Sequence, residues 1–359
     1  MKVRPKILAV ETRNPPLCLT QTEAIEFARL KPGMTPEEFS WYERFLGDKG
    51  IETRYFGLPS IDLTFHENGD QAIVRFQKEA TKIGAEALSK ALAALDMEPH
   101  SIDALVVATC TGYLCPGLTS YIAEAAGLRA DVFALDLSGI GCGAAIPALR
   151  SGIHFLAEHP GARVAVLCVE ISSAAISWGK EVDLILSNSI FGDGAACVIL
   201  SDDPFREGLE IREFASRLWP KYREELRFKN RDTRLMNTIS PRVPILAARA
   251  VNELLEQLAP AAQSNGFLAG VHPGGRKVLD EIESRVPRLQ GKLGPSREVL
   301  RRYGNMSSPS IFFVLKEILA QGLLAPGHPI LLFAFGAGFS AFGVSLEFKP
   351  SASKAVHPR

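Results

Sequence analysis

Three short segments of this 359-residue chain carry side chains that could do chemistry together. They are Gly-Ile-Gly-Cys at Gly139–Cys142, Val-His-Pro-Gly-Gly at Val271–Gly275 and Tyr-Gly-Asn-Met-Ser-Ser at Tyr303–Ser308. They offer a thiol nucleophile, an imidazole and a neutral amide donor, which suit covalent acyl transfer beside a stabilised carbanion. The combination predicts an enzyme that forms carbon–carbon bonds.

Cys142 is flanked by glycines and is followed by the helix-like stretch Ala144–Arg150. The glycines permit a sharp strand-to-helix turn, which places the thiol at a helix N-terminus. Amide dipoles there, and a nearby imidazole, are expected to lower the pKa of the thiol. The alternative is a buried structural cysteine.

His272 and Asn305 each have a structural alternative as well. His272 ends the apolar strand Phe267–Val271 at a tight turn, where α/β folds build sites, but such a histidine also serves as a hydrogen-bonded structural group. Asn305 precedes a helix that starts near Ser308 and could merely cap it. Because all three residue types occur together without a competing metal motif, we favour a shared site.

The pattern between these segments is alternating strand and helix. Continuous apolar runs predict buried strands at Leu105–Thr109, Arg163–Ile171, Ala195–Ser201, Phe267–His272, Ile330–Phe335 and Ala341–Phe348. Apolar spacings of three and four predict helices at Ala72–Leu95, Pro244–Leu258 and Ser308–Leu319. The chain is therefore predicted to be an α/β protein.

Composition and charge restrict the class of protein. Apolar residues make up 47%, and 40 Lys and Arg balance 40 Asp and Glu, which gives no global field for nucleic acid or an anionic membrane. No apolar run reaches membrane-spanning length and no secretory leader is recognisable, so a cytoplasmic protein without membrane insertion is expected. The six cysteines form no Cys-x-x-Cys pair, which favours reduced thiols. A composition break at 202–222 suggests two halves, 1–205 carrying the cysteine and 206–359 carrying the histidine and asparagine.

The chemical segments resemble the Cys, His and Asn motifs of the type III polyketide synthases, the chalcone and stilbene synthase superfamily of the thiolase fold. Further matching motifs follow in the same order along the chain: Asn14-Pro15-Pro16, Gly161–Val164, Phe191–Ala196, His272–Gly275, Gly304–Ser308 and Phe335–Gly338. The resemblance implies a homodimer of five-layered αβαβα subunits, each made of two similar halves. It also implies iterative condensation without a carrier domain, a metal or a cofactor other than CoA thioester substrates.

The resemblance assigns roles to the three residues. Cys142 carries the acyl chain as a thioester, helped by His272, and His272 and Asn305 stabilise the enolate formed when malonyl-CoA loses carbon dioxide. Phe191 becomes a gatekeeper beside the cavity, although Gly192–Gly194 could instead be a hairpin turn. The expected substrate-binding residues are Phe191, Cys110, Thr111, Cys115, Ala175, Asn237, Ser307, Gly336 and Gly338.

Several of these positions depart from the plant enzymes. Asn237 takes the place of a second gatekeeper phenylalanine, and Ala175 that of a hydroxyl side chain. Cys110 is like the second cavity cysteine of bacterial tetrahydroxynaphthalene synthases, and Cys115 occupies the position that reaches across the dimer interface. A bacterial-type enzyme with a reshaped cavity is expected.

The expected CoA contacts are also altered. Only Lys49 keeps a basic residue of the plant pattern, because the other two positions fall on uncharged aromatic residues. Arg44, Arg276 or Lys277 could rebuild the phosphate contact, although for each residue taken alone we favour a solvated surface charge.

The starter unit and two alternative functions stay open. Asn237 favours a long acyl starter, whereas Cys110 favours a malonyl-primed aromatic product. One alternative is a single condensation of the β-ketoacyl-acyl carrier protein synthase III type, which needs a carrier protein. The other is a non-catalytic paralogue that acts as a partner subunit.

Overall fold

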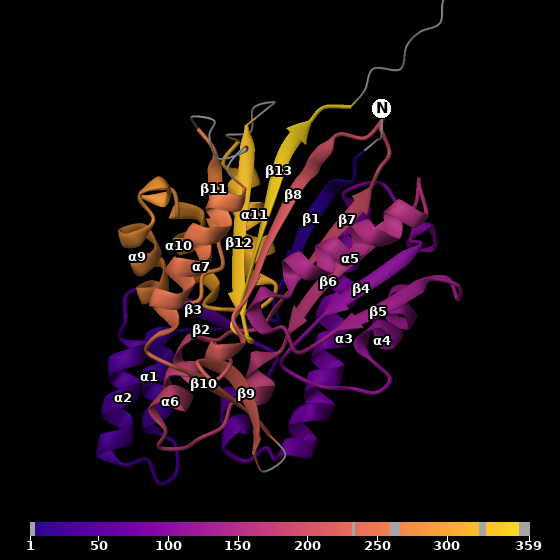
Figure 1. The fold of residues 1–359 in the computed structure, drawn as a ribbon. Coiled ribbons are helices and arrows are strands. Elements are labelled where there is room, and N and C mark those ends of the chain that lie inside the picture. The colour runs from indigo at the N-terminus through magenta and orange to yellow at the C-terminus, as the bar shows by residue number, and fades with distance from the viewer. Residues whose placement is uncertain (1–3, 232–233, 259–265, 323–327, 352–359) are drawn as a thin grey trace, which may run out of the picture.

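The computed structural model describes residues 4–231, 234–258, 266–322 and 328–351. Within this part of the chain, nine strands form one continuous sheet in the order β11-β12-β13-β8-β1-β7-β6-β4-β5 (Figure 1). These strands are β1 (Lys6–Arg13), β4 (Ala104–Ala108), β5 (Phe133–Leu137), β6 (Val164–Glu170), β7 (Gly194–Ser201), β8 (Gly208–Leu218), β11 (Leu268–Val271), β12 (Pro329–Gly336) and β13 (Ser340–Lys349).

The sheet consists of two halves with the same strand pattern. From the centre outward, β1, β7, β6 and β4 repeat the directions of β8, β13, β12 and β11, with two antiparallel pairs followed by a parallel pair. The halves meet where Lys6 and Ile7 of β1 pair antiparallel with β8. The apparent composition break at 202–222 thus contains β8, a central strand of the sheet. We keep the division at 205/206, between β7 and β8, as a proposal.

Alternation of side chains along the strands produces the layers. In β6, Val164, Val166 and Cys168 face a middle core shared with α5 (Ala145–Glu158) and α11 (Ser310–Ala320). The intervening residues of β6 face α3 (Gly69–Ala93) and α4 (Leu118–Ala126) instead, because successive strand side chains point to opposite faces.

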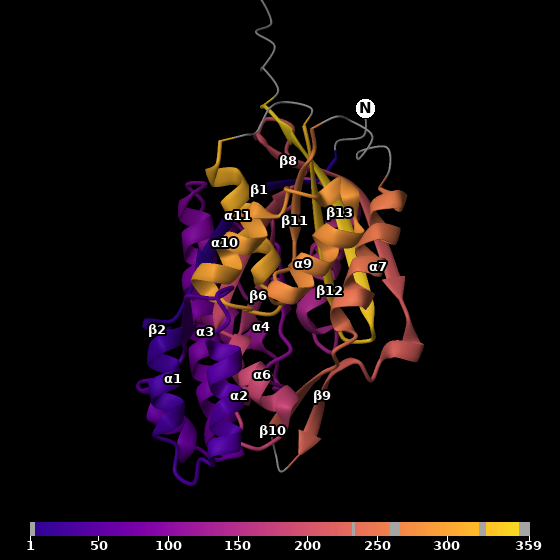
Figure 2. The same cartoon turned by 90° about the vertical axis from the view of Figure 1, so that its left-hand side faces the viewer.

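The second half is built in the same way. Alternate residues of β12 face the middle core or the outer helices α7 (Val243–Gln257) and α9 (Arg276–Arg285). Figure 2 shows α3 and α7 on opposite sides of the molecule. The result is the five-layered αβαβα arrangement of a thiolase-like fold, as predicted.

A further group of elements covers one end of the sheet, at the bottom of Figure 1. It comprises α1 (Gln21–Arg29), α2 (Pro36–Leu46), α6 (Val182–Ile190), the pair β2 (Leu17–Thr20) and β3 (Thr53–Phe56), and the hairpin β9 (Leu226–Arg231) and β10 (Arg234–Ile239). Capping boxes at Thr20 and Thr35 begin α1 and α2 by satisfying otherwise unpaired backbone N–H groups. These elements enclose the ends of the strands that carry the site.

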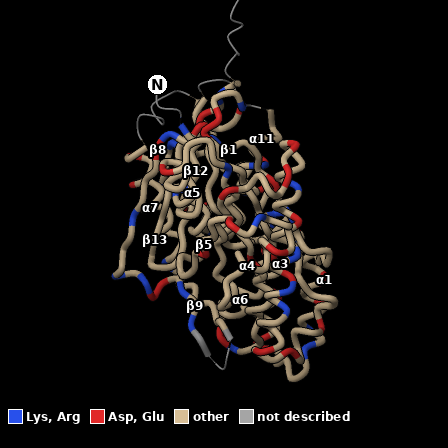
Figure 3. Tube along the Cα trace, turned by 90° about the vertical axis from the view of Figure 1, so that its right-hand side faces the viewer, with Lys and Arg blue, Asp and Glu red and all other residues tan. Residues whose placement is uncertain are grey.

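Basic and acidic residues are interspersed over the chain (Figure 3). In the described residues, every helix is too short or too polar to cross a membrane. The six strands and three helices predicted from the sequence correspond to β4, β6, β7, β11, β12 and β13 and to α3, α7 and α11.

Candidate active site

The three predicted chemical residues come from both halves and line one cavity of about 1100 Å³. Cys142 lies on the single helical turn Gly141–Gly143 that precedes α5. His272 directly follows β11, and Asn305 lies between α10 (Gly294–Tyr303) and α11. The tertiary structure therefore brings together segments that are 130 and 33 residues apart in the sequence (272 − 142 and 305 − 272).

The turn that carries Cys142 packs tightly against the end of β12. A Cβ atom at Gly336 would lie 2.4 Å from the carbonyl oxygen of Ile140 and 3.1 Å from the backbone nitrogen of Cys142, so this position requires glycine. Gly336 thus supports the turn, and it is the turn rather than Gly336 that lines the large cavity.

The pKa of the Cys142 thiol is shifted upward, whereas the sequence led us to expect a lowered pKa. Its pKa is raised to about 12, mainly by burial and to a smaller extent by the negative charge of Glu170, and a hydrogen bond with Ser307 only partly opposes this. Desolvation destabilises a thiolate here by more free energy than the short helical turn and the hydrogen bond stabilise it. The resting thiol of Cys142 is therefore neutral.

His272 occupies an apolar environment. Only 1% of the residue is exposed, its backbone N–H donates to the carbonyl oxygen of Phe333 at 2.8 Å, and the edge of its ring meets Phe335 at a centroid distance of 5.3 Å. Burial lowers the pKa of His272 to about 3, so the imidazole is neutral at physiological pH. Nδ1 is buried and has no hydrogen-bond partner among the described residues, unlike the structural histidine considered as an alternative.

Asn305 is held as a donor. Its Oδ1 accepts from the backbone N–H of Ser307 at 2.8 Å, and its Nδ2 donates to the carbonyl oxygen of Gly274 at 3.4 Å. The alternative that Asn305 caps the following helix is wrong, because α11 begins at Ser310 without a side-chain cap. No other acceptor among the described residues bonds to Nδ2, so its second N–H is available to a ligand.

Phe191 lies beside Asn305, since the two residues form an isolated β-bridge. The backbone N–H of Asn305 donates to Ile190 at 2.9 Å, and that of Gly192 donates back to Asn305 at 3.0 Å. The hairpin-turn alternative for this segment is also wrong, because it connects α6 to β7 and Phe191 lines the cavity.

Glu170 is a site residue that our sequence reasoning missed. It ends β6, is fully buried, and accepts hydrogen bonds from the backbone N–H groups of Cys110 and Thr111 at 3.0 Å and from the Ser308 hydroxyl at 2.6 Å. The Cys110 thiol lies 3.2 Å from the Ser307 hydroxyl, which also contacts Glu170. A carboxylate at the end of an otherwise apolar strand is the feature of the sequence that could have identified Glu170 as a site residue.

The remaining cavity residues divide between two smaller spaces. Thr111, Ala175, Asn237 and Ser307 line a space of about 20 Å³ together with Phe191. Cys110 and Gly338 line another, of about 710 Å³. The residues that we expected in one chamber thus line neighbouring spaces, which adjoin where the Cys110 thiol contacts the Ser307 hydroxyl.

Phe228 is a second residue that the sequence analysis missed, and it lines both smaller spaces. It pairs with Asn237 across the β9–β10 hairpin. An aromatic wall is therefore present near Asn237, contributed by the opposite strand. The signal was an aromatic residue within a charged segment of alternating polarity, Leu226–Arg231.

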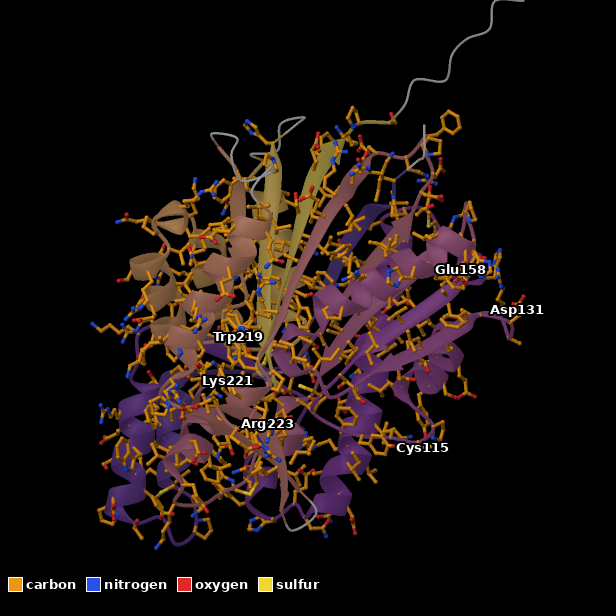
Figure 4. The ribbon with its side chains drawn as sticks, in the orientation of Figure 1. Cys115, Asp131, Glu158, Trp219, Lys221 and Arg223 are labelled. Carbon is orange, nitrogen blue, oxygen red and sulfur yellow. The ribbon has the colours of Figure 1, made fainter. Side chains whose placement is uncertain are left out.

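Cys115 lies apart from these spaces. It is exposed, lines none of the three cavities, and is found toward the edge of the molecule on the side of β5 and α4 (Figure 4).

The four predicted CoA contacts, Arg44, Lys49, Arg276 and Lys277, all line the 1100 Å³ cavity. Arg276 is engaged by Asp48 through two contacts of 2.7 and 2.9 Å, and the Arg44 guanidinium lies 5.2 Å from the ring centroid of Trp41. Lys49 and Lys277 are exposed and form no ion pair with another described residue. These lysines are the more available anion contacts.

Among the described residues, no group of three His, Cys, Asp or Glu side chains is placed to hold a metal ion. The chemistry available from the described side chains is that of a thiol, a neutral imidazole and an amide around a shared cavity. That set suits an acyltransferase with the thiolase-like fold.

Comparison with known families agrees with this class. Residues 14–212 match the family described as FAE1/Type III polyketide synthase-like protein, and residues 211–349 match the chalcone and stilbene synthase C-terminal domain. A 3,5-dihydroxyphenylacetyl-CoA synthase from Streptomyces toyocaensis is 29% identical over 349 residues, which cover 93% of this chain and 88% of that protein.

Solved structures show the same fold. The polyketide synthase PKS-I of the brown alga Ectocarpus siliculosus superposes with a TM-score of 0.90 at 24% identity, covering 97% of this chain and 99% of that one. The 1,3,6,8-tetrahydroxynaphthalene synthase of Streptomyces coelicolor gives 0.87 at 24% identity, covering 97% and 100%. This chain belongs to the type III polyketide synthase family, whose members are acyltransferases that catalyse decarboxylative condensation.

Proposed function

We propose that this chain loads an acyl-CoA starter on Cys142, extends it by iterative decarboxylative condensation with malonyl-CoA, and cyclises the product to a pyrone, resorcinol or polyhydroxylated aromatic. The observation that carries this proposal is that Cys142, His272 and Asn305 line the same large cavity as the four basic residues. That cavity offers one path from surface cations, suited to CoA phosphates, to the thiol.

Loading begins from two neutral groups. As the Cys142 sulfur attacks the thioester carbonyl of the starter, neutral His272 takes the thiol proton. The new carbon–sulfur bond replaces the bond to CoA, and the CoA sulfur leaves with that proton. Because His272 Nδ1 is buried without a described partner, Nε2 is the nitrogen that would exchange this proton.

Extension uses the amide and the imidazole as hydrogen-bond donors. When the bond between C2 of malonyl-CoA and its carboxylate breaks, carbon dioxide leaves and the electron pair remains as an enolate. Asn305 Nδ2–H would stabilise the enolate oxygen. His272 Nε2–H would join it once the neutral imidazole has exchanged its proton from Nδ1 to Nε2, the nitrogen that the loading step leaves unprotonated. Carbon 2 then attacks the acyl thioester on Cys142, the bond between the acyl carbon and the Cys142 sulfur breaks, and the released thiolate takes up one proton from solvent before the lengthened chain is loaded. Phe191 would exclude water from this step.

A homodimer is supported by an exposed sheet edge. β5 is outermost in the sheet, and Phe133 at its start is 48% exposed. An exposed apolar edge strand is a template for pairing with a second copy, and Cys115 lies on the same side of the molecule (Figure 4). We expect Phe133→Lys to convert a dimer into a monomer in analytical ultracentrifugation; a wild-type monomer would contradict the proposal. Cytoplasmic localisation stays a prediction.

A direct assay would identify the starter unit. The name of the Streptomyces toyocaensis relative supports an aromatic product, and Cys110 beside the 710 Å³ space supports malonyl priming. Purified protein should be incubated with malonyl-CoA alone and with short, aromatic and long acyl-CoA starters, and the products identified by mass. Lactone or aromatic products without carrier protein support the proposal. Turnover that requires a carrier protein would instead favour the single-condensation alternative.

The non-catalytic alternative needs a different test from thiol alkylation. Because burial keeps the Cys142 thiol protonated, slow reaction with iodoacetamide would not indicate a degenerate site. Intact-protein mass spectrometry after incubation with acyl-CoA is decisive, since only a functional nucleophile gains the acyl mass.

A further inference from the structure

The C-terminus of α6 is satisfied by groups from distant segments. The final carbonyl groups of a helix lack partners within the helix. Here the carbonyl oxygens of Asn188 and Phe191 accept from Arg54 Nη1 at 2.7 and 2.8 Å, and that of Ser189 accepts from Gln21 at 3.1 Å. The carbonyl oxygen of Ile190 accepts from the backbone N–H of Asn305 at 2.9 Å. The helix end is thus tied to the segment that carries the amide donor.

Arg54 is the buried charge in this arrangement. It lies on β3, is 3% exposed, and its Nε donates to Gln21 Oε1 at 2.9 Å. Burial lowers its pKa to about 10, which leaves it cationic at neutral pH. A cation at a helix C-terminus interacts favourably with the helix dipole, so the carbonyl groups that it binds also stabilise its charge.

The aliphatic part of Arg54 contacts the other segment. Gly304 has a φ angle of +67°, and a Cβ atom there would lie 2.8 Å from Arg54 Cγ and 2.8 Å from the carbonyl oxygen of Ile190. Gly304 immediately precedes Asn305, which forms the β-bridge with Phe191. Arg54 therefore binds the Phe191 side of the bridge with its guanidinium and packs against the Asn305 side with its stem.

We propose that Arg54 is a positioning residue that fixes Phe191 and Asn305 relative to each other, and so supports malonyl-CoA decarboxylation much more than acyl loading on Cys142. This inference rests on the proposed function. The two half-reactions separate because the turn of Cys142 packs against Gly336 and Ala337 rather than against Arg54. A shift of the amide donor of about 1 Å is enough to cost on the order of a hundredfold in rate.

The test compares two half-reactions in matched variants. Arg54→Met keeps an unbranched stem and removes the donors. Release of carbon dioxide from malonyl-CoA without starter should fall about 10- to 100-fold, while acylation of Cys142, read by intact-protein mass, should stay within about threefold. Arg54→Lys, which keeps the charge but cannot bind both carbonyl groups with the same geometry, should give an intermediate ratio of the two rates.

Arg75→Met is the matched control. Arg75 is also buried, at 8% exposure, but it pairs with Glu67 and donates to Gly57 and Ser173, not to the α6 end. Its replacement should lower the unfolding temperature without changing the ratio of decarboxylation to loading.

If Arg54→Met slows decarboxylation and acyl loading equally, so that the ratio of the two rates is that of the wild type, the inference is overturned. If Arg54→Met does not fold, Arg54→Lys decides, and an unchanged ratio there overturns it. A wild-type protein that neither loads nor decarboxylates would refute the proposed function instead. In that case amide exchange decides, because the N–H groups of Gly192 and Asn305 should exchange faster in Arg54→Lys than in Arg75→Met; equal exchange would overturn the positioning role.

Discussion

The two halves of the sheet place different chemistry at equivalent positions. In the first half, Cys110 follows β4 and Cys142 precedes α5; in the second half, His272 follows β11 and Asn305 precedes α11. The sulfur atoms of Cys110 and Cys142 lie near the negative charge of Glu170, whereas the imidazole of His272 lies against the ring of Phe335. The repeated topology therefore sets where these groups lie. The residues at the equivalent positions differ: the first half carries thiols, and the second half carries a neutral imidazole and an amide.

Replacing the nucleophile should separate the halves most sharply. Cys142→Ala should abolish the acyl-enzyme and lower product formation by at least about 10³-fold, because the proposed mechanism carries the acyl chain on the Cys142 sulfur. Malonyl-CoA decarboxylation, assigned to the second half, should stay within about tenfold. Intact-protein mass and carbon dioxide release measure the two effects. Cys110→Ala is the matched control and should still gain the acyl mass; labelling that persists in Cys142→Ala would refute the assigned nucleophile.

Removing the amide donor should give the converse result. Asn305→Ala should slow carbon dioxide release by about 10²- to 10³-fold, because an oxyanion loses a buried donor. Acyl loading on Cys142 should change by less than about threefold, since that step does not use the enolate. The same two assays apply. Parallel loss of loading would show that the division of labour between the halves is wrong.

His272 should make stability depend on pH. An unfolded histidine takes up a proton below about pH 6.5, whereas burial holds the folded pKa at about 3, so the wild type loses stability as pH falls from about 6.5 toward 3. His272→Gln lacks this penalty. Its unfolding free energy, relative to wild type, should improve by about 2 to 3 kcal/mol between about pH 7.5 and pH 4.5.

Urea unfolding at both pH values measures this change. Asp193 opposes the trend in both proteins, because burial raises its pKa to about 6 and ionisation then destabilises the fold as pH rises. Its contribution cancels in the difference between the variants. A constant difference across this range would mean that His272 is not held neutral.

The smallest effects on activity are expected for the exposed basic residues that line the 1100 Å³ cavity. Lys49→Ala should raise the KM for acyl-CoA about two- to fivefold at constant kcat, because an exposed charge contributes on the order of 1 kcal/mol. Arg276→Ala should change KM by less than about twofold, since Asp48 already engages that guanidinium. Steady-state kinetics at low salt would compare them. A larger effect for Arg276 would show that it releases Asp48 to bind CoA.

Among the strands, continuous apolar runs were predicted from the sequence, and strands with mixed burial such as β8 and β5 were missed. Strands such as β6 and β12 are buried on both faces and gave continuous apolar runs. β8 alternates apolar and charged residues beside a turn-like segment, and β5 is largely exposed at the sheet edge, so neither gave that signal. The pattern of burial that identifies these strands exists only once the sheet has formed.

The features of the site also divide into those that the sequence indicated and those that depend on folding. Cys142, His272 and Asn305 were identifiable because their residue types and flanking glycines are local properties of the chain. The neutral thiol was not, because it depends on burial and on Glu170, 28 residues away in sequence (170 − 142). Phe228 and Arg54 were missed for a related reason, since each acts through a strand or helix end that only folding brings near.

By itself, the sequence determined the α/β class, the three chemical residues and the order of the motifs, because these follow from residue identity and local spacing. Tertiary structure alone decided that the three residues share a cavity, that the thiol and the imidazole are neutral, and how the helix end and its distant arginine fix the donor. Charge states and positions depend on desolvation and on contacts between remote segments, and neither is a local property of the chain.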